Sequence, residues 1–131
     1  MAGNGSTNVY IAVVDDDESF SRSLSRLLRA AHYQTVMYAS AEAFLADAKR
    51  PRFDCLLLDV ALGGISGIEL GRRLAAVGWK TPIIYITAHD DAKTREEARA
   101  TGCFALVGKV EPSEVLLGAV ADALRAGRPS V

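Results

Sequence analysis

The 131-residue sequence predicts a single α/β domain in which helices cover both faces of a five-stranded parallel sheet. Five short, mainly apolar runs alternate with five segments predicted as helices. Most of the runs carry almost no polar residues, which is typical of strands buried on both faces of a parallel sheet. Half of the residues (50%) are hydrophobic and 24% are charged, an ordinary balance for one globular domain with its own core.

The first predicted strand, 10–14, leads directly into four consecutive acidic residues at 15–18. One of these acids can cap the following helix and complement its positively polarised N-terminus. That helix is predicted from one apolar stripe, with arginines mostly on the opposite side. The stripe consists of Phe20, Leu24, Leu27, Leu28 and Ala31.

The next two predicted elements are short. Residues 34–38 form the second strand, and Ser40 is expected to begin a helix that continues to about Lys49. The side chains expected to face inward from that helix are Phe44, Leu45 and Ala48.

The third predicted strand, 55–59, is an unbroken apolar run that ends in one carboxylate, Asp59. Open α/β sheets bind their ligands at the carboxyl ends of the strands, so Asp59 is predicted as the chemical centre of the protein. After a loop at 60–65, Ser66 and Glu69 predict a capping box for the next helix. The apolar residues of that helix, which stops at Gly78, are Ile68, Leu70, Leu74 and Val77.

The last third of the chain predicts two more strands, at 82–86 and 104–107. The helix between them begins at Asp90 or Asp91 and ends at Gly102, and its only apolar residues are three alanines. Little packing energy therefore holds this helix. Pro112 is expected at the first position of the final helix. The inward residues of that helix are Leu116, Val120, Ala123 and Leu124.

Five strands joined by helices in this way fit the flavodoxin-like strand order 2-1-3-4-5, with right-handed crossovers. In that order the first, third, fourth and fifth strands are neighbours. Each of these strands leads into polar residues at the same edge of the sheet, which are Asp15, Asp16, Asp59, Thr87 and Lys109.

This set of side chains suits phosphoryl chemistry. Crowded carboxylates repel one another unless a cation joins them, and their oxygens suit a hard ion such as Mg²⁺. A lysine ammonium is a compact charge for a phosphoryl oxygen, and a threonine hydroxyl can donate one hydrogen bond to the same group. The combination predicts a phosphoryl site in which Asp59 is the candidate carboxylate nucleophile, with charge stabilisation by metal and lysine.

At these positions the sequence resembles the receiver domain of two-component response regulators, over about residues 8–126. Each motif alone is weak, but four in order at the ends of neighbouring strands are a strong signal. The details of the first and fourth motifs look most like receivers of the FixJ type. The motifs are Val13-Val14-Asp15-Asp16-Asp17-Glu18, Leu58-Asp59 with Gly67, Ile86-Thr87-Ala88, and Lys109.

The resemblance implies that Asp59 is the phosphoacceptor for a histidine of a sensor kinase. It further implies that Mg²⁺ is bound by Asp16, Asp59 and the backbone carbonyl of Ala61, and by Asp15 through water. Lys109 would pair with the phosphoryl group, and the Thr87 hydroxyl would move to it after transfer.

Phosphorylation would then change the face formed by the fourth helix, fifth strand and fifth helix, which would control an output domain, most often transcriptional, or another partner. A phosphorylation-dependent homodimer also fits the resemblance. The domain would be a signalling switch rather than an enzyme, because it catalyses only its own phosphoryl transfer and dephosphorylation.

The sequence also departs from the family pattern. Gly63 stands where a proline is usual, and Val110 follows Lys109 where a proline with a cis bond is usual, so we expect a trans bond there. Leu106 replaces the usual aromatic residue, although Phe104 lies two residues earlier. These departures keep open a second reading, a degenerate receiver that acts as a phosphorylation-independent interaction module.

Two other classes fit less well. A phosphatase of the haloacid dehalogenase type needs a second aspartate two residues after the nucleophile, and that residue is Ala61. A flavodoxin binds the flavin phosphate in a first loop rich in Ser, Thr and Gly, whereas this loop holds four acids that would repel a phosphate.

Composition adds further expectations. Residues 1–8 are expected to be a disordered tail, 9–126 the receiver domain, and 127–131 a tail or the start of a linker. The net charge of −1 provides no basic footprint for nucleic acid. Neither a signal peptide nor a membrane-spanning segment is recognisable, so we expect a cytoplasmic protein in which Cys55 and Cys103 are reduced.

Overall fold

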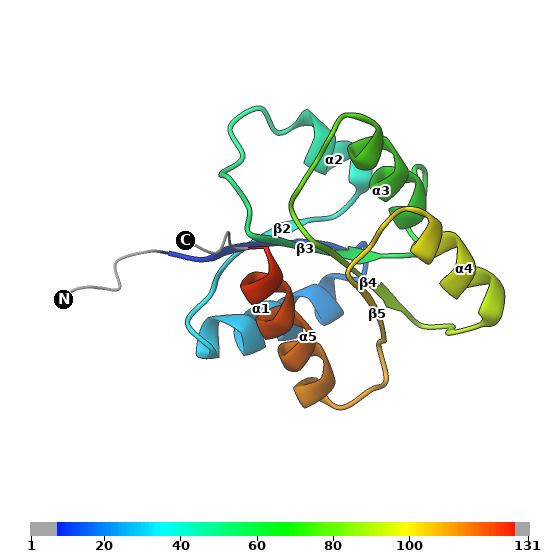
Figure 1. Cartoon of the computed structure of the whole chain (residues 1–131). Coiled ribbons are helices and arrows are strands. Elements are labelled where there is room, and N and C mark those ends of the chain that lie inside the picture. The colour runs from blue at the N-terminus through cyan, green and yellow to red at the C-terminus, as the bar shows by residue number, and fades with distance from the viewer. Residues whose placement is uncertain (1–7, 128–131) are drawn as a thin grey trace.

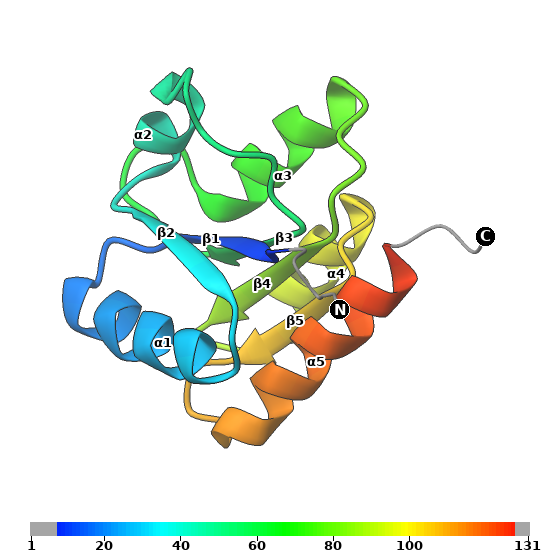
Figure 2. The same ribbon diagram turned by 90° about the vertical axis from the view of Figure 1, so that its left-hand side faces the viewer.

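The computed structural model describes residues 8–127 and forms a five-stranded parallel sheet in the order β2-β1-β3-β4-β5 (Figure 1). This is the predicted strand order, with helices on both faces of the sheet (Figure 2). The tails predicted at 1–8 and 127–131 lie outside the described residues, apart from Asn8 and Gly127. The elements are β1 (Tyr10–Val14), α1 (Glu18–Ala30), β2 (Gln34–Tyr38), α2 (Ala41–Ala46), β3 (Cys55–Asp59), α3 (Gly67–Ala76), β4 (Ile83–Thr87), α4 (Ala92–Ala100), β5 (Ala105–Gly108) and α5 (Ser113–Ala126).

The sheet separates two apolar cores. Alternate residues of a strand point to opposite faces, so Leu56 and Leu58 of β3 enter one core and Leu57 enters the other. The first core is completed by α2, α3 and α4, and the second by α1 and α5. Every residue of β3 is buried, including Asp59. The strand that carries the predicted chemical centre is therefore held from both sides.

Helix ends confirm part of the predicted capping. Asp17 is the N-cap of α1, and Asp91 rather than Asp90 is the N-cap of α4. Ser66 caps α3 by accepting a hydrogen bond from the Glu69 backbone N–H at 3.0 Å. The other half of the predicted capping box does not form, because the Glu69 carboxylate pairs with Arg72 and Arg73 one turn further along the helix.

Several predicted details are wrong. Helix α2 ends at Ala46 instead of Lys49, because the Arg50 side chain bonds the backbone carbonyls of Phe44 and Asp47 and the chain turns there. Leu45 and Ala48, predicted to face inward, are exposed: Leu45 lies on the outer side of α2, and Ala48 lies beyond the end of the helix.

At other element ends the differences are smaller. Val77 is 77% exposed because it follows the last turn of α3, beyond the residues that pack on the sheet. Phe104 precedes β5, and Pro112 is the N-cap of α5, one position before the expected one. Gly78 and Gly102 end α3 and α4 as predicted, each with a positive φ.

No helix within residues 8–127 has both the length and the apolar character needed to cross a lipid bilayer.

Candidate functional site

The predicted acids meet at the carboxyl edge of the sheet. Asp15 follows β1, Asp59 ends β3, and the two strands are paired neighbours. Asp15, Asp16 and Asp59 each offer a carboxylate oxygen, and these oxygens lie within 4.8 Å of one another. Asp15 and Asp59 are only 3% and 4% exposed, whereas Asp16 faces solvent. Such a cluster, half buried and open on one side, has the donor set that a hard divalent cation prefers.

Lys109 joins this cluster from the loop after β5. Its Nζ lies 2.9 Å from Oδ2 of Asp15 and 3.4 Å from Oδ2 of Asp59. Its backbone N–H donates to the Thr87 carbonyl at 2.8 Å, which anchors the lysine to β4. The bond to Val110 is trans, as expected. Burial alone would lower the pKa of Lys109, but attraction to Asp15 and Asp59 outweighs it, so the pKa lies above its usual value.

The negative charge of Asp15 is disfavoured by its surroundings in the folded protein. Burial, together with repulsion from Asp59, raises the pKa of Asp15, although the Asp17 N–H and Lys109 oppose the shift. Oδ1 accepts the Asp17 N–H at 2.8 Å. Oδ2 accepts no hydrogen bond from the described residues: the Lys109 ammonium lies within ion-pair distance but outside hydrogen-bond geometry. This buried oxygen therefore retains the capacity to bind a cation.

Asp59 is held by its own strand end and by the chain that follows. Its Oδ1 accepts the Ala61 backbone N–H at 3.2 Å, so Ala61 lies directly beside the carboxylate. Gly67 packs against the backbone of the same residue, where a Cβ atom would lie 2.0 Å from the Asp59 carbonyl oxygen. Only glycine fits there, which gives a physical reason for a glycine eight residues after the aspartate.

Thr87 lies at the same edge but is not joined to the acids. Its hydroxyl donates to the His89 carbonyl at 2.9 Å and accepts the His89 backbone N–H at 3.0 Å. The hydroxyl thus closes a tight turn at the start of the β4–α4 loop. Of the six predicted site residues, Asp15, Asp16, Asp59 and Lys109 are in one cluster, the backbone of Ala61 adjoins Asp59, and Thr87 is beside the cluster.

Two residues near the site were not predicted from the sequence. Glu42 of α2 accepts the Ile65 backbone N–H at 2.9 Å and so ties down the loop after Asp59. Gly64 of that loop has a φ of +71°, and a Cβ there would lie 2.5 Å from the Glu42 carboxylate. Phe20, assigned only to the apolar stripe of α1, lies with its ring against the Lys109 ammonium. No local motif signals either contact, because each joins segments far apart in the sequence.

We expect Asp15→Asn to stabilise the protein when divalent cations are chelated. Asparagine keeps an oxygen for the Asp17 N–H but removes a buried charge near Asp59. Because the folded-state pKa is raised, the stability that Asp15 contributes is complete below its unfolded pKa of about 3.9 and is lost as pH rises through the folded value. The gain in Tm, roughly 4 °C for about 1 kcal/mol, should be largest at neutral pH and vanish near pH 4.

Thermal melts of both proteins between pH 4 and 8 in a chelator measure this difference. Asp16→Asn is the matched control, because its carboxylate is exposed and its removal should change the Tm little. A lower Tm for Asp15→Asn at neutral pH would contradict the prediction that the buried charge of Asp15 destabilises the metal-free fold.

The sequence from residue 11 to residue 121 matches the family model for the response regulator receiver domain. Among curated relatives, the response regulator protein TmoT of Ectopseudomonas mendocina is 36% identical over 115 residues, which are 88% of this chain and 52% of TmoT. The transcriptional regulatory protein FixJ of Bradyrhizobium diazoefficiens is 32% identical over 124 residues, 95% of this chain and 60% of FixJ. The chain therefore spans between half and two thirds of the length of these relatives.

Solved structures agree with this likeness. The crystal structure of FixJ-N superposes with a TM-score of 0.84 at 30% identity, covering 95% of this chain and 99% of that one.

Proposed function

This chain belongs to the family of response regulator receiver domains, which act in two-component signalling, and we propose that Asp59 accepts a phosphoryl group from a histidine of a sensor kinase. The observation that carries the proposal is the position of Lys109, whose ammonium contacts the Asp59 and Asp15 carboxylates together. A cation at that point can neutralise the charge of a phosphoryl group on Asp59. A carboxylate nucleophile needs such stabilisation because the group it receives is itself anionic.

We propose that the acid cluster binds Mg²⁺. Asp16, Asp59 and the backbone carbonyl of Ala61 would be direct ligands, and Asp15 would act through water. Oδ2 of Asp15, which accepts no hydrogen bond from the described residues, and the cluster of three carboxylates support this assignment. The bound ion would neutralise charge on the phosphoryl oxygens, and the Lys109 ammonium would add a second positive charge there. Mg²⁺ takes only one or two carboxylates with several waters, so an exposed Asp16 fits its coordination.

The response would involve Thr87 and α4. The Thr87 hydroxyl bonds His89, so turning to a phosphoryl group would release this turn and move the β4–α4 loop. Helix α4 buries only Ala98 and is therefore free to shift at low cost. The altered face of α4, β5 and α5 would act on an output domain or another protein, or pair with a second copy. Relatives named as transcriptional regulatory proteins support a transcriptional output, and a cytoplasmic location is part of the same proposal.

Intact-mass spectrometry after incubation with a small-molecule phosphodonor tests the proposal. We expect the native protein to gain one phosphoryl group in Mg²⁺ and none in EDTA. Asp16→Asn should require a higher Mg²⁺ concentration for the same labelling, because it loses a direct ligand. If the native protein gains no phosphoryl mass in Mg²⁺, the proposal fails and the alternative, a receiver that works as a phosphorylation-independent interaction module, is favoured instead.

A further inference from the structure

The Lys109 side chain receives little support from its own segment. Gly108 before it has no side chain, and Val110 after it is 92% exposed. The backbone bond from Lys109 to the Thr87 carbonyl fixes the start of the side chain but not its end. A lysine has four rotatable bonds, so whatever contacts its ammonium decides where the charge lies.

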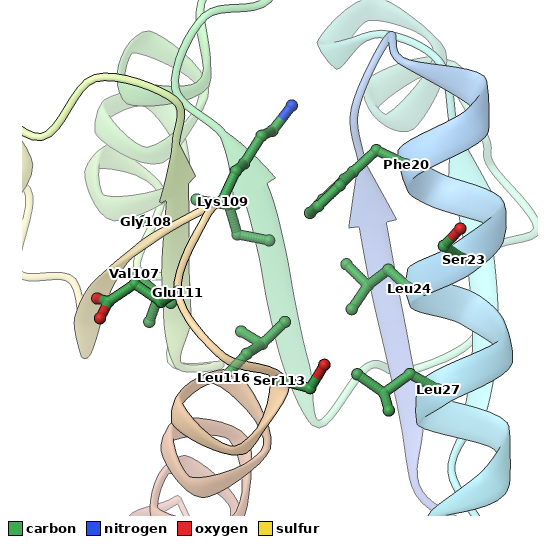
Figure 3. Close-up of a pocket in the computed structure, with 11 residues that line it drawn as sticks. Phe20, Ser23, Leu24, Leu27, Val107, Gly108, Lys109, Glu111, Ser113 and Leu116 are labelled. Carbon is green, nitrogen blue, oxygen red and sulfur yellow. The ribbon is translucent and has the colours of Figure 1, made fainter.

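Phe20 places an uncharged aromatic ring against this ammonium. Nζ of Lys109 lies 4.6 Å from the centroid of the Phe20 ring. Figure 3 shows the Phe20 side chain extending from α1 toward the lysine that comes from the loop after β5. The ring face is negatively polarised and attracts a cation at this distance. The ammonium therefore lies between two carboxylates and one aromatic face.

The position of Phe20 is set by the same aspartate that contacts the lysine. The Asp15 carboxylate accepts the Asp17 N–H at 2.8 Å, and the Asp17 carboxylate accepts the Phe20 N–H at 3.0 Å. Oδ2 of Asp15 faces Lys109 at 2.9 Å. These contacts form a closed circuit through the four residues. The ring and the ammonium are thus both placed relative to Asp15.

A half-open pocket of about 250 Å³ between α1 and the start of α5 borders this circuit. Phe20 and Lys109 lie together at one end of it, above Leu24 and Leu116 (Figure 3). Because Phe20 and Lys109 both line the pocket, loss of the ring would enlarge the space beside the lysine. The lysine could then turn toward the pocket, and water could reach the charge from that side.

We propose that Phe20 is a positioning residue for Lys109, whose aromatic face holds the ammonium beside Asp59 for phosphoryl transfer. The effect on phosphoryl transfer rests on the proposed function, but the contact between Phe20 and Lys109 exists in the unphosphorylated protein and can be measured there. The ring attracts the ammonium through its quadrupole. A side chain of the same shape with a weaker quadrupole should therefore hold the ammonium less well.

Site-specific incorporation of phenylalanine carrying one, two or three ring fluorines at position 20 of the full chain tests this role, because fluorination weakens the ring quadrupole and preserves its shape. We expect the rate of Asp59 labelling by a small phosphodonor in Mg²⁺ to fall stepwise, by about 2- to 5-fold for three fluorines. The same series at Phe104, which is 41% exposed and precedes β5, is the matched control and should leave the rate unchanged. Equal rates along the series at position 20 would overturn the proposal.

An NMR measurement without phosphodonor or metal separates this proposal from the proposed function. The ε-methylene protons of Lys109 should be shifted upfield by the ring, and Phe20→Leu should remove that shift. An unshifted methylene in the native protein would overturn the Phe20 role even if Asp59 is labelled normally. A shifted methylene in a protein that takes no label would leave the Phe20 contact standing while the proposed phosphoryl transfer fails.

Discussion

Replacement of Asp59 by asparagine is expected to abolish phosphoryl labelling by a small phosphodonor. Asparagine keeps the shape of the side chain and an oxygen for the Ala61 N–H, which Asp59 accepts at 3.2 Å. It lacks the carboxylate oxygen that would attack phosphorus, and an amide is not a nucleophile of comparable strength. The loss of label should therefore be complete within detection by intact mass, while the circular-dichroism spectrum stays that of the native fold.

The matched control for this variant is Asp54→Asn. Asp54 has an exposed carboxylate and directly precedes β3. It accepts the Tyr10 backbone N–H at 2.9 Å. Asparagine can accept that bond equally well, so labelling and stability should remain native. Undiminished labelling of Asp59→Asn would mean that another side chain receives the phosphoryl group, and the assignment of Asp59 would be wrong.

The sheet and most of the site could be predicted because both depend on general rules of topology. A buried apolar run such as 55–59 indicates a parallel strand, and one strand order brings several carboxyl ends together. Asp15, Asp59 and Lys109 needed no information beyond their place at strand ends. Their clustering in the structure follows from the pairing of β1, β3, β4 and β5.

The remaining features depend on which of several available partners a side chain takes in the folded chain. Ser66 and Glu69 match a capping box, yet two arginines take the glutamate. Thr87 lies at the carboxyl edge of the sheet, as predicted, but its hydroxyl bonds the backbone of His89. Phe20 fits a core stripe in sequence, and only the fold reveals that its ring meets Lys109. A local pattern identifies a donor or an apolar side chain but not the partner that the fold provides.

Gly67→Ala is expected to be strongly destabilising, although helix propensity alone predicts a gain. Gly67 begins α3, where alanine is favoured over glycine by about 1 kcal/mol in a helix. A Cβ atom at this position would lie 2.0 Å from the Asp59 carbonyl oxygen and 2.8 Å from its carbonyl carbon. Both are backbone atoms of the buried strand β3, so no side-chain rotation relieves the overlap. Either α3 moves outward or the end of β3 moves, and the Asp59 carboxylate moves with it.

We expect Gly67→Ala to lose about 3 kcal/mol of unfolding free energy, at the upper end for an overpacked site, and to lower the Tm by roughly 10 °C. Gly118→Ala in α5 is the matched control: its Cβ would meet no atom within 4 Å, so alanine should raise stability there. Urea unfolding of both variants measures the difference, and the labelling rate of Gly67→Ala at a temperature where it remains folded reports the displacement of Asp59. Native stability in Gly67→Ala would contradict the close packing of α3 on the end of β3, which holds the backbone of Asp59.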